Sequence, residues 1–114
     1  MSSNVAIIPV LSDKLEDWKQ LLTDMSGPRL SDFEDFNTRY QLTRHRVWLQ
    51  QNPDGSNLAV VLHEGEGANT IMQRFATSDH PFDVELRNKI GDAHGIDFTQ
   101  PPPPPPELLM DSGK

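Results

Sequence analysis

The fold is decided by one stretch of the sequence, RHRVWLQQNPDGSNLAVVLHE, which spans residues 44–64. Two segments that each contain a short apolar run, 44–51 and 58–64, flank a loop that contains Asp54 and Gly55. An Asp-Gly pair between two such segments is typical of a two-residue hairpin turn. The stretch therefore predicts an antiparallel hairpin centred on residues 54 and 55.

That turn predicts a strand register and, through it, two different faces. Arg46 then lies opposite His63, and Trp48 lies opposite Val61. Because side chains alternate between the faces of a sheet, one face is apolar and is expected to meet helices: Val47, Leu49, Leu58, Val60 and Leu62. The other face mixes cations, an indole and an imidazole with small apolar residues: Arg44, Arg46, Trp48, Gln50, Ala59, Val61 and His63. A slip of one residue would exchange the faces.

The mixed face predicts a lined cavity or a subunit interface. Arg44 and Arg46 would bind an anionic or carbonyl-bearing ligand, while Trp48 and Val61 pack against its apolar body. His63 is the candidate catalytic residue, because an imidazole transfers protons near neutral pH. The alternative is structural: Arg46 pairs with a carboxylate across a dimer, and His63 forms a local hydrogen bond.

The remaining elements follow outward from the hairpin. A β-branched run predicts a first strand that is buried on both faces, and apolar residues at helical spacing predict helices that are broken at Gly27-Pro28 and near Pro81. The expected elements are a strand at 5–11, helices at 13–25 and 30–42, a helix at 68–76, a helix at 81–93, and a short last strand at 96–98.

This order, β-α-β-β-α with a final short strand, predicts an α+β fold: a ferredoxin-like domain with an antiparallel sheet. The domain is expected to span residues 1–98. Residues 99–114 form a separate proline-rich C-terminal arm.

Two segments carry a family resemblance: YQLTRHRVWLQQNPDGSNLAVVLHEGEG at 40–67 and FATSDHPFDVELRNKIGDAHGIDF at 75–98. Together with the element order and the split first helix, they resemble bacterial members, of unknown activity, of the dimeric α/β-barrel superfamily. The resemblance covers residues 5–98. It implies a homodimer in which two sheets face each other as a barrel. No catalytic signature of the superfamily's oxygenases or haem enzymes maps onto this chain, and the proline run lies outside the shared pattern.

Composition narrows the class of protein. Seventeen acidic residues against ten basic ones give a net charge of -7, which disfavours nucleic-acid binding. The chain has no cysteine, so disulfides and thiolate metal sites are excluded. The apolar runs are too short to span a bilayer, and no signal peptide is recognisable. A cytoplasmic protein without membrane association is expected.

Asp79 and His80 form a secondary candidate site, because a carboxylate beside a histidine can orient the imidazole. The alternative is a helix start capped by Ser78 or Asp79. His94, at an expected helix C-terminus, is interpreted as structural. The four histidines show no metal-binding spacing, so neither a metal nor a cofactor is predicted.

The proline run, residues 101–106, predicts a stiff polyproline II segment. In a dimer this segment could carry Leu108, Leu109 and Met110 across the neighbouring subunit. A disordered tail, or a ligand for an aromatic groove of another protein, remains an alternative.

Two functions fit these observations. The first is a homodimer that binds a small acidic, aromatic or carbonyl compound in the barrel, either as a binding protein or as a cofactor-free enzyme for proton transfer or oxidation. The second is a non-catalytic structural or regulatory interaction module, in which the same residues make dimer contacts.

Overall fold

The computed structural model of the chain describes residues 2–101 and 104–113. Up to residue 94, three strands and four α-helices follow one another along the chain in the order that the sequence predicts. The elements are β1 (Ser3–Val10), a 3₁₀ turn (Ser12–Lys14), α1 (Leu15–Met25), α2 (Leu30–Arg39), β2 (Arg44–Gln51), β3 (Asn57–Glu64), α3 (Ile71–Thr77) and α4 (Pro81–His94).

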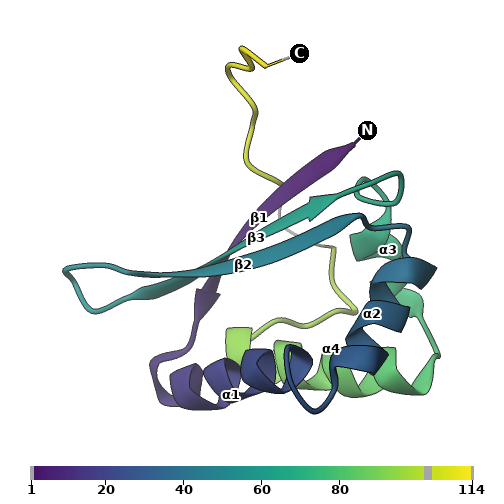
Figure 1. Ribbon diagram of the computed structural model, residues 1–114. Helices are drawn as coiled ribbons and strands as arrows, with labels where there is room; N and C mark the ends of the chain where they lie inside the picture. The colour runs from purple at the N-terminus through teal and green to yellow at the C-terminus, as the bar shows by residue number, and fades with distance from the viewer. Residues whose placement is uncertain (1, 102–103, 114) are drawn as a thin grey trace.

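The strands form one antiparallel sheet in the order β1-β3-β2, with β3 in the centre. In the described part of the chain, all the helices lie on one side of this sheet and none covers the other side (Figure 1). The predicted α+β class with an antiparallel sheet is therefore confirmed. The uncovered side is called the open face below.

β1 was expected to be buried on both faces, but within the single chain only one of its faces is covered. Its residues alternate between exposed and covered, with Val5 and Ile7 exposed by 38% and 50%. These two side chains lie on the open face. Pro9 fits its place, because β1 is an edge strand and one side of it needs no N–H donor.

The predicted hairpin forms, but its register differs by one residue from the prediction. Trp48 lies opposite Val60 and Val47 lies opposite Val61. The loop is a turn over Asn52–Gly55, in which the Gly55 N–H donates to the Asn52 carbonyl (3.0 Å), and Gly55 has a φ of 89°. This is a three-residue hairpin loop, whose last residue adopts a positive φ.

Pro53 explains the difference. A two-residue turn at 54 and 55 would need the N–H of residue 53 to close the loop, and proline has none. Proline instead suits the second position of a type I turn that begins at Asn52. In the observed loop, the Asn52 N–H closes the ladder by donating to the Ser56 carbonyl (2.9 Å).

The predicted strand at 96–98 is absent: these residues are coil and turn. In the described part of the chain, nothing pairs with the outer edge of β1. The helix expected from residue 68 begins at Ile71, because residues 68–70 form a turn.

The core lies between the sheet and the helices and comprises two apolar clusters. The larger is centred on Phe36, Tyr40 and Phe75, and the smaller contains Trp18 and Ala59. No helix in the described part of the chain is long and apolar enough to cross a membrane.

The C-terminal segment has no regular secondary structure over residues 104–113, and Leu108, Leu109 and Met110 are exposed by 75%, 85% and 82%. The segment extends on the same side of the sheet as the open face (Figure 1). Residues 102 and 103 of the predicted polyproline segment lie outside the described residues.

Candidate functional site

Two histidines lie side by side on the helix-covered face of the sheet. His45 on β2 is directly opposite His63 on β3. The two Nε2 atoms are 3.2 Å apart, and the rings meet edge to face with centroids 4.4 Å apart. Alternation along each strand places them beside Val47 and Val61, which also face the helices.

Only one of the two imidazoles uses both of its nitrogens. Nδ1 of His45 lies 3.1 Å from Oδ1 of Asn37 on α2. Nδ1 of His63 has no partner, and it is the only such buried side-chain nitrogen or oxygen within residues 2–101 and 104–113. Because most buried polar atoms are paired, an exception of this kind calls for an explanation.

The pair borders a cavity of about 110 Å³ between the sheet and the helices. Both histidines line it, together with residues from the two apolar clusters, among them Trp18, Phe33, Phe36, Val61, Ile71 and Phe75. An apolar cavity with a few polar groups is the usual form of a small-molecule site.

Burial keeps both imidazoles neutral at physiological pH. Burial, with a smaller contribution from the neighbouring His63, lowers the pKa of His45 to about 3. Burial alone lowers the pKa of His63 to about 4. A neutral imidazole has one N–H donor and one lone pair, so each ring can both give and take a hydrogen bond.

The structure separates the residues that the sequence was expected to bring together. Arg44, Arg46 and Trp48 lie on the open face, and Trp48 is exposed by 47%. His63 and Val61 lie on the opposite side, under the helices. The predicted mixed face is therefore wrong, because the one-residue difference in register exchanges the faces of β3 relative to β2.

The open face is instead mainly apolar. β1 contributes Val5, Ile7 and Pro9, and β3 contributes Leu58, Val60 and Leu62 in direct pairs with them. Its charged residues lie toward one corner, where Arg44 is 3.9 Å from Glu64.

Asp79 and His80 do not act together in the structure. Asp79 is exposed, whereas His80 is the N-cap of α4 and its Nδ1 accepts a hydrogen bond from the Phe82 N–H (3.2 Å). The expected cap at Ser78 or Asp79 is therefore wrong, although a helix start does form here. The Ser78 hydroxyl is engaged elsewhere, with Asp83.

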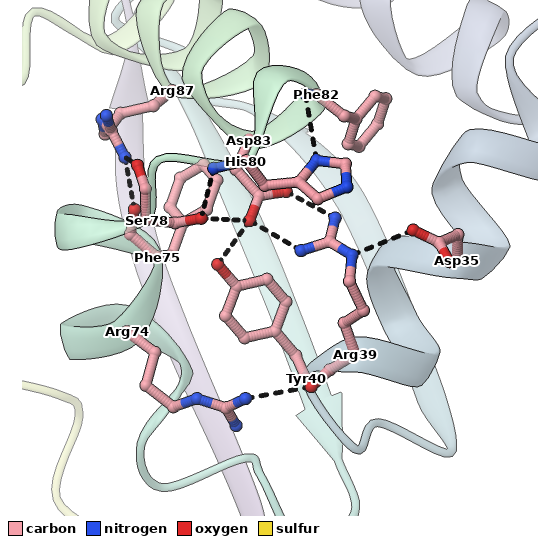
Figure 2. A network of polar contacts seen from close by, with 10 residues as sticks. All are labelled: Asp35, Arg39, Tyr40, Arg74, Phe75, Ser78, His80, Phe82, Asp83 and Arg87. Atoms are coloured by element: carbon pink, nitrogen blue, oxygen red, sulfur yellow. Dashed lines mark hydrogen bonds and ion pairs between the residues drawn. The ribbon is translucent and has the colours of Figure 1, made fainter.

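Asp83 is fully buried and is the centre of a polar network that the sequence reasoning missed (Figure 2). It accepts hydrogen bonds from Tyr40 and Ser78 (both 2.7 Å) and from two nitrogens of Arg39 (2.7 and 2.9 Å). Burial opposes ionisation, but these bonds outweigh it and lower the pKa of Asp83 to about 2.

This network has a structural role, because the partners of Asp83 are Arg39 at the end of α2, Tyr40 directly after it, and Ser78 in the loop before α4. It joins these segments to α4, and none of its buried side-chain nitrogens and oxygens is without a partner. The sequence did hold a signal for this network. Asp83 stands next to Phe82 and three positions before Leu86, so that a carboxylate lies within the apolar stripe of the helix.

His94 is also structural. It is 6% exposed, and its Nδ1 is 2.7 Å from the Pro9 carbonyl, to which it donates. Burial lowers its pKa, while the bond to Pro9 opposes that shift. The residue therefore attaches the end of α4 to β1 as a neutral ring.

In the described part of the chain, no three histidine, aspartate or glutamate residues are placed to hold a metal ion. Comparisons with protein-family models, with curated proteins and with solved structures found no match to this chain.

Proposed function

We propose that this protein is a homodimer that binds a small, largely apolar molecule in the cavity between its sheet and its helices. One observation supports the proposal above the others: the unpaired Nδ1 of His63 belongs to a residue that lines an apolar cavity. The remaining walls would hold the body of the ligand, and His63 would orient it. In an enzymatic reaction, His63 would be the residue that transfers a proton.

The size and polarity of the cavity favour a small aromatic or carbonyl compound. The cavity, at about 110 Å³, is smaller than the apolar cavity of about 150 Å³ that binds benzene, so a ligand no larger than a single ring is expected. The small acidic ligand expected from the sequence does not suit it, because Arg44 and Arg46 lie on the other side of the sheet.

Two adjacent valines on β3 offer a matched test. Val61 lines the cavity, whereas Val60 points to the open face. We expect Val61→Phe to abolish binding of benzene, followed by chemical-shift changes of the core residues, because the added ring occupies the cavity. Val60→Phe should bind benzene as the natural protein does. Equal binding by both variants would refute the cavity as the site.

The open face supports the dimer. Val5, Ile7 and Trp48 are large apolar side chains that are exposed on it by 38%, 50% and 47%. The whole face, with its polar residues, spans roughly 400 Å² over three eight-residue strands. A stable interface needs about 800 Å² from each partner. In the proposed dimer, the exposed Leu108, Leu109 and Met110 of the other subunit supply part of the remainder, since they extend on this side of the sheet.

The strand order is a further support. A ferredoxin-like sheet has a split β-α-β arrangement, in which the third strand lies between the first and the second, as β3 does here. In the dimeric α/β-barrel superfamily, which the sequence resembles, two such sheets face each other. A cytoplasmic location remains part of this proposal on sequence grounds.

A lysine at Ile7 tests the dimer. Ile7 is half exposed in the single chain, so Ile7→Lys should leave the fold intact while placing a charge in the interface. We expect sedimentation to show a dimer for the natural protein and a monomer for this variant. Gln20→Lys, at an exposed position of α1, makes the same charge change away from the open face and should remain dimeric. A natural protein that is monomeric at all concentrations would refute the dimer.

The open face alone supports the alternative function, a non-catalytic interaction module, because a protein partner could bind this surface whether or not the cavity holds a ligand. A protein that dimerises but binds no small probe in the cavity would support this alternative over the first proposal.

A further inference from the structure

The outer edge of β1 has free backbone groups and little protection. The Gly65 N–H donates to the Ser2 carbonyl (2.9 Å). Because the amides of an antiparallel strand point alternately to its two sides, the N–H and carbonyl groups of Val5 and Ile7 point away from β3, and no strand in the described part of the chain pairs with them. Such edges are usually blunted by charged residues or by proline, but β1 has no charged residue and Pro9 blunts only its end.

The core beneath β1 is incompletely covered. On the helix-covered face Asn4, Ala6 and Ile8 are partly exposed, whereas Ala59 and His63 of the neighbouring β3 are buried on the same face. Ala6 and Ile8 also line the cavity between the sheet and the helices. An additional strand beside β1 would therefore complete this margin of the core as well as pair the free backbone groups.

One segment of the chain has the composition of such a strand. Leu108, Leu109 and Met110 are exposed by 75%, 85% and 82%, and Glu107 and Asp111 stand at the two ends of this apolar run. Burial of the apolar side chains is favourable, and the two carboxylates at the ends can remain in solvent. Five extended residues span roughly 16 Å, which matches the unprotected part of the β1 edge.

We propose that residues 107–111 of a second copy of this chain bind as an antiparallel fourth strand along the outer edge of β1, with Leu109 opposite Ala6. The proposal rests on the proposed dimer and states how the C-terminal segment binds in it. Antiparallel pairing matches the rest of the sheet. A register shifted toward the end of β1 is disfavoured, because Pro9 has no N–H to pair.

This register suits the side chains of both strands. Leu108 lies opposite Ile7 and Met110 lies opposite Val5, in pairs that exchange backbone hydrogen bonds, so both side chains join the apolar open face. Leu109 points to the other face of the sheet, where it covers the partly exposed margin of the core.

A second copy is favoured over the chain's own β1. In the single chain the segment has no regular secondary structure, and Leu109 is 85% exposed. The segment extends on the side of the open face (Figure 1), where the second copy is proposed to lie. Two copies that exchange these segments use both β1 edges, so the exchange closes at a dimer.

Single cysteines test the pairing, because the natural chain has none. Ala6→Cys and Leu109→Cys are made in separate chains with tags of different mass and are mixed in a glutathione redox buffer. Facing residues of a non-hydrogen-bonded pair lie close enough for a disulfide. We expect at least about tenfold more mixed disulfide than with Gln20→Cys, at an exposed position of α1, in place of Ala6→Cys, since pairing raises the effective concentration of the thiols.

Two neighbouring proline variants test the register. The Leu108 N–H would donate to β1, whereas the Leu109 N–H would point away from it. Leu108→Pro should speed amide hydrogen exchange at Ile7 about tenfold, because the pairing loses a hydrogen bond, and Leu109→Pro should have a much smaller effect. Equal effects of the two variants would overturn the proposed pairing.

The outcomes separate this inference from the proposed function. A natural protein that is monomeric in sedimentation overturns both the dimer and the fourth strand. A dimer that gives no excess of mixed disulfide over the Gln20→Cys control overturns the fourth strand alone. A chain that carries both Ala6→Cys and Leu109→Cys and closes its disulfide internally, at a dilution where separate chains do not link, would show that the segment pairs with its own β1, and it would also overturn the inference.

Discussion

Mild acid should destabilise this protein because of the buried histidine pair. In the folded state His45 and His63 stay neutral down to pH values of about 3 and about 4. In the unfolded chain each takes up a proton near pH 6.5. Between these limits the unfolded state binds more protons than the folded state, so the free energy of unfolding falls as the pH is lowered.

The size of the effect follows from the two pKa values. Between about pH 7.5 and about pH 5.5, each histidine that stays neutral in the fold costs roughly 1.4 kcal/mol of stability, and the pair costs about 3 kcal/mol. His94, whose pKa is also lowered, acts in the same direction. Asp83 does not contribute in this range, because its pKa is about 2 and its unfolded value is near 4.

Urea unfolding at the two pH values measures this loss. Trp18 is buried and gives a fluorescence signal of unfolding. The protein concentration must be held constant, because dimerisation changes apparent stability. The double variant His45→Phe/His63→Phe should lose much less stability in acid. His80→Ala, which alters a histidine outside the cavity, should keep the full loss.

Two results would refute this reasoning. The first is a protein that is equally stable, or more stable, at the lower pH. The second is a double variant that loses as much stability as the natural protein, since the loss would then arise from other groups.

Two further predictions concern the framework around the cavity. Asp83→Asn should lower the free energy of unfolding by about 3 kcal/mol, because it removes the charge that pairs with Arg39 in a buried site. Asp35→Asn alters an exposed ion pair of the same arginine and should lower it by less than about 0.5 kcal/mol. Equal losses in urea unfolding would contradict the structural role given to Asp83. Gly67→Ala should prevent normal folding, because an added Cβ would overlap the backbone carbonyl of Tyr40; a variant with the thermal midpoint of the natural protein would contradict that contact.

Much of the fold could be predicted from local patterns. The split first helix, the hairpin, and the start of α4 at Pro81 follow from apolar spacing and from proline and glycine positions, which act over a few residues. The face of β2 was also predicted correctly. Its alternation already placed His45 beside Val47 and Leu49, so the histidine under the helices could have been recognised from β2 alone.

The face of β3 could have been predicted from Pro53. An Asp-Gly pair indicates a turn, but proline before it lacks the N–H that a two-residue turn requires. Giving Pro53 this weight would have selected the longer loop and moved His63 to the same side as His45. The short last strand is a different case, because three residues of mixed character do not determine whether they pair with an edge.

Local patterns were enough to assign the strands and helices up to residue 94 and the side of β2 that faces the core, because these features depend on residues a few positions apart. The pairing of His45 with His63, the nitrogen of that pair that has no partner, and the contact of Asp83 with Arg39 became visible only in the folded chain. Each of these contacts joins residues that are far apart along the chain. Their geometry depends on how the sheet and the helices pack, and a difference of one residue in a single loop is enough to change it.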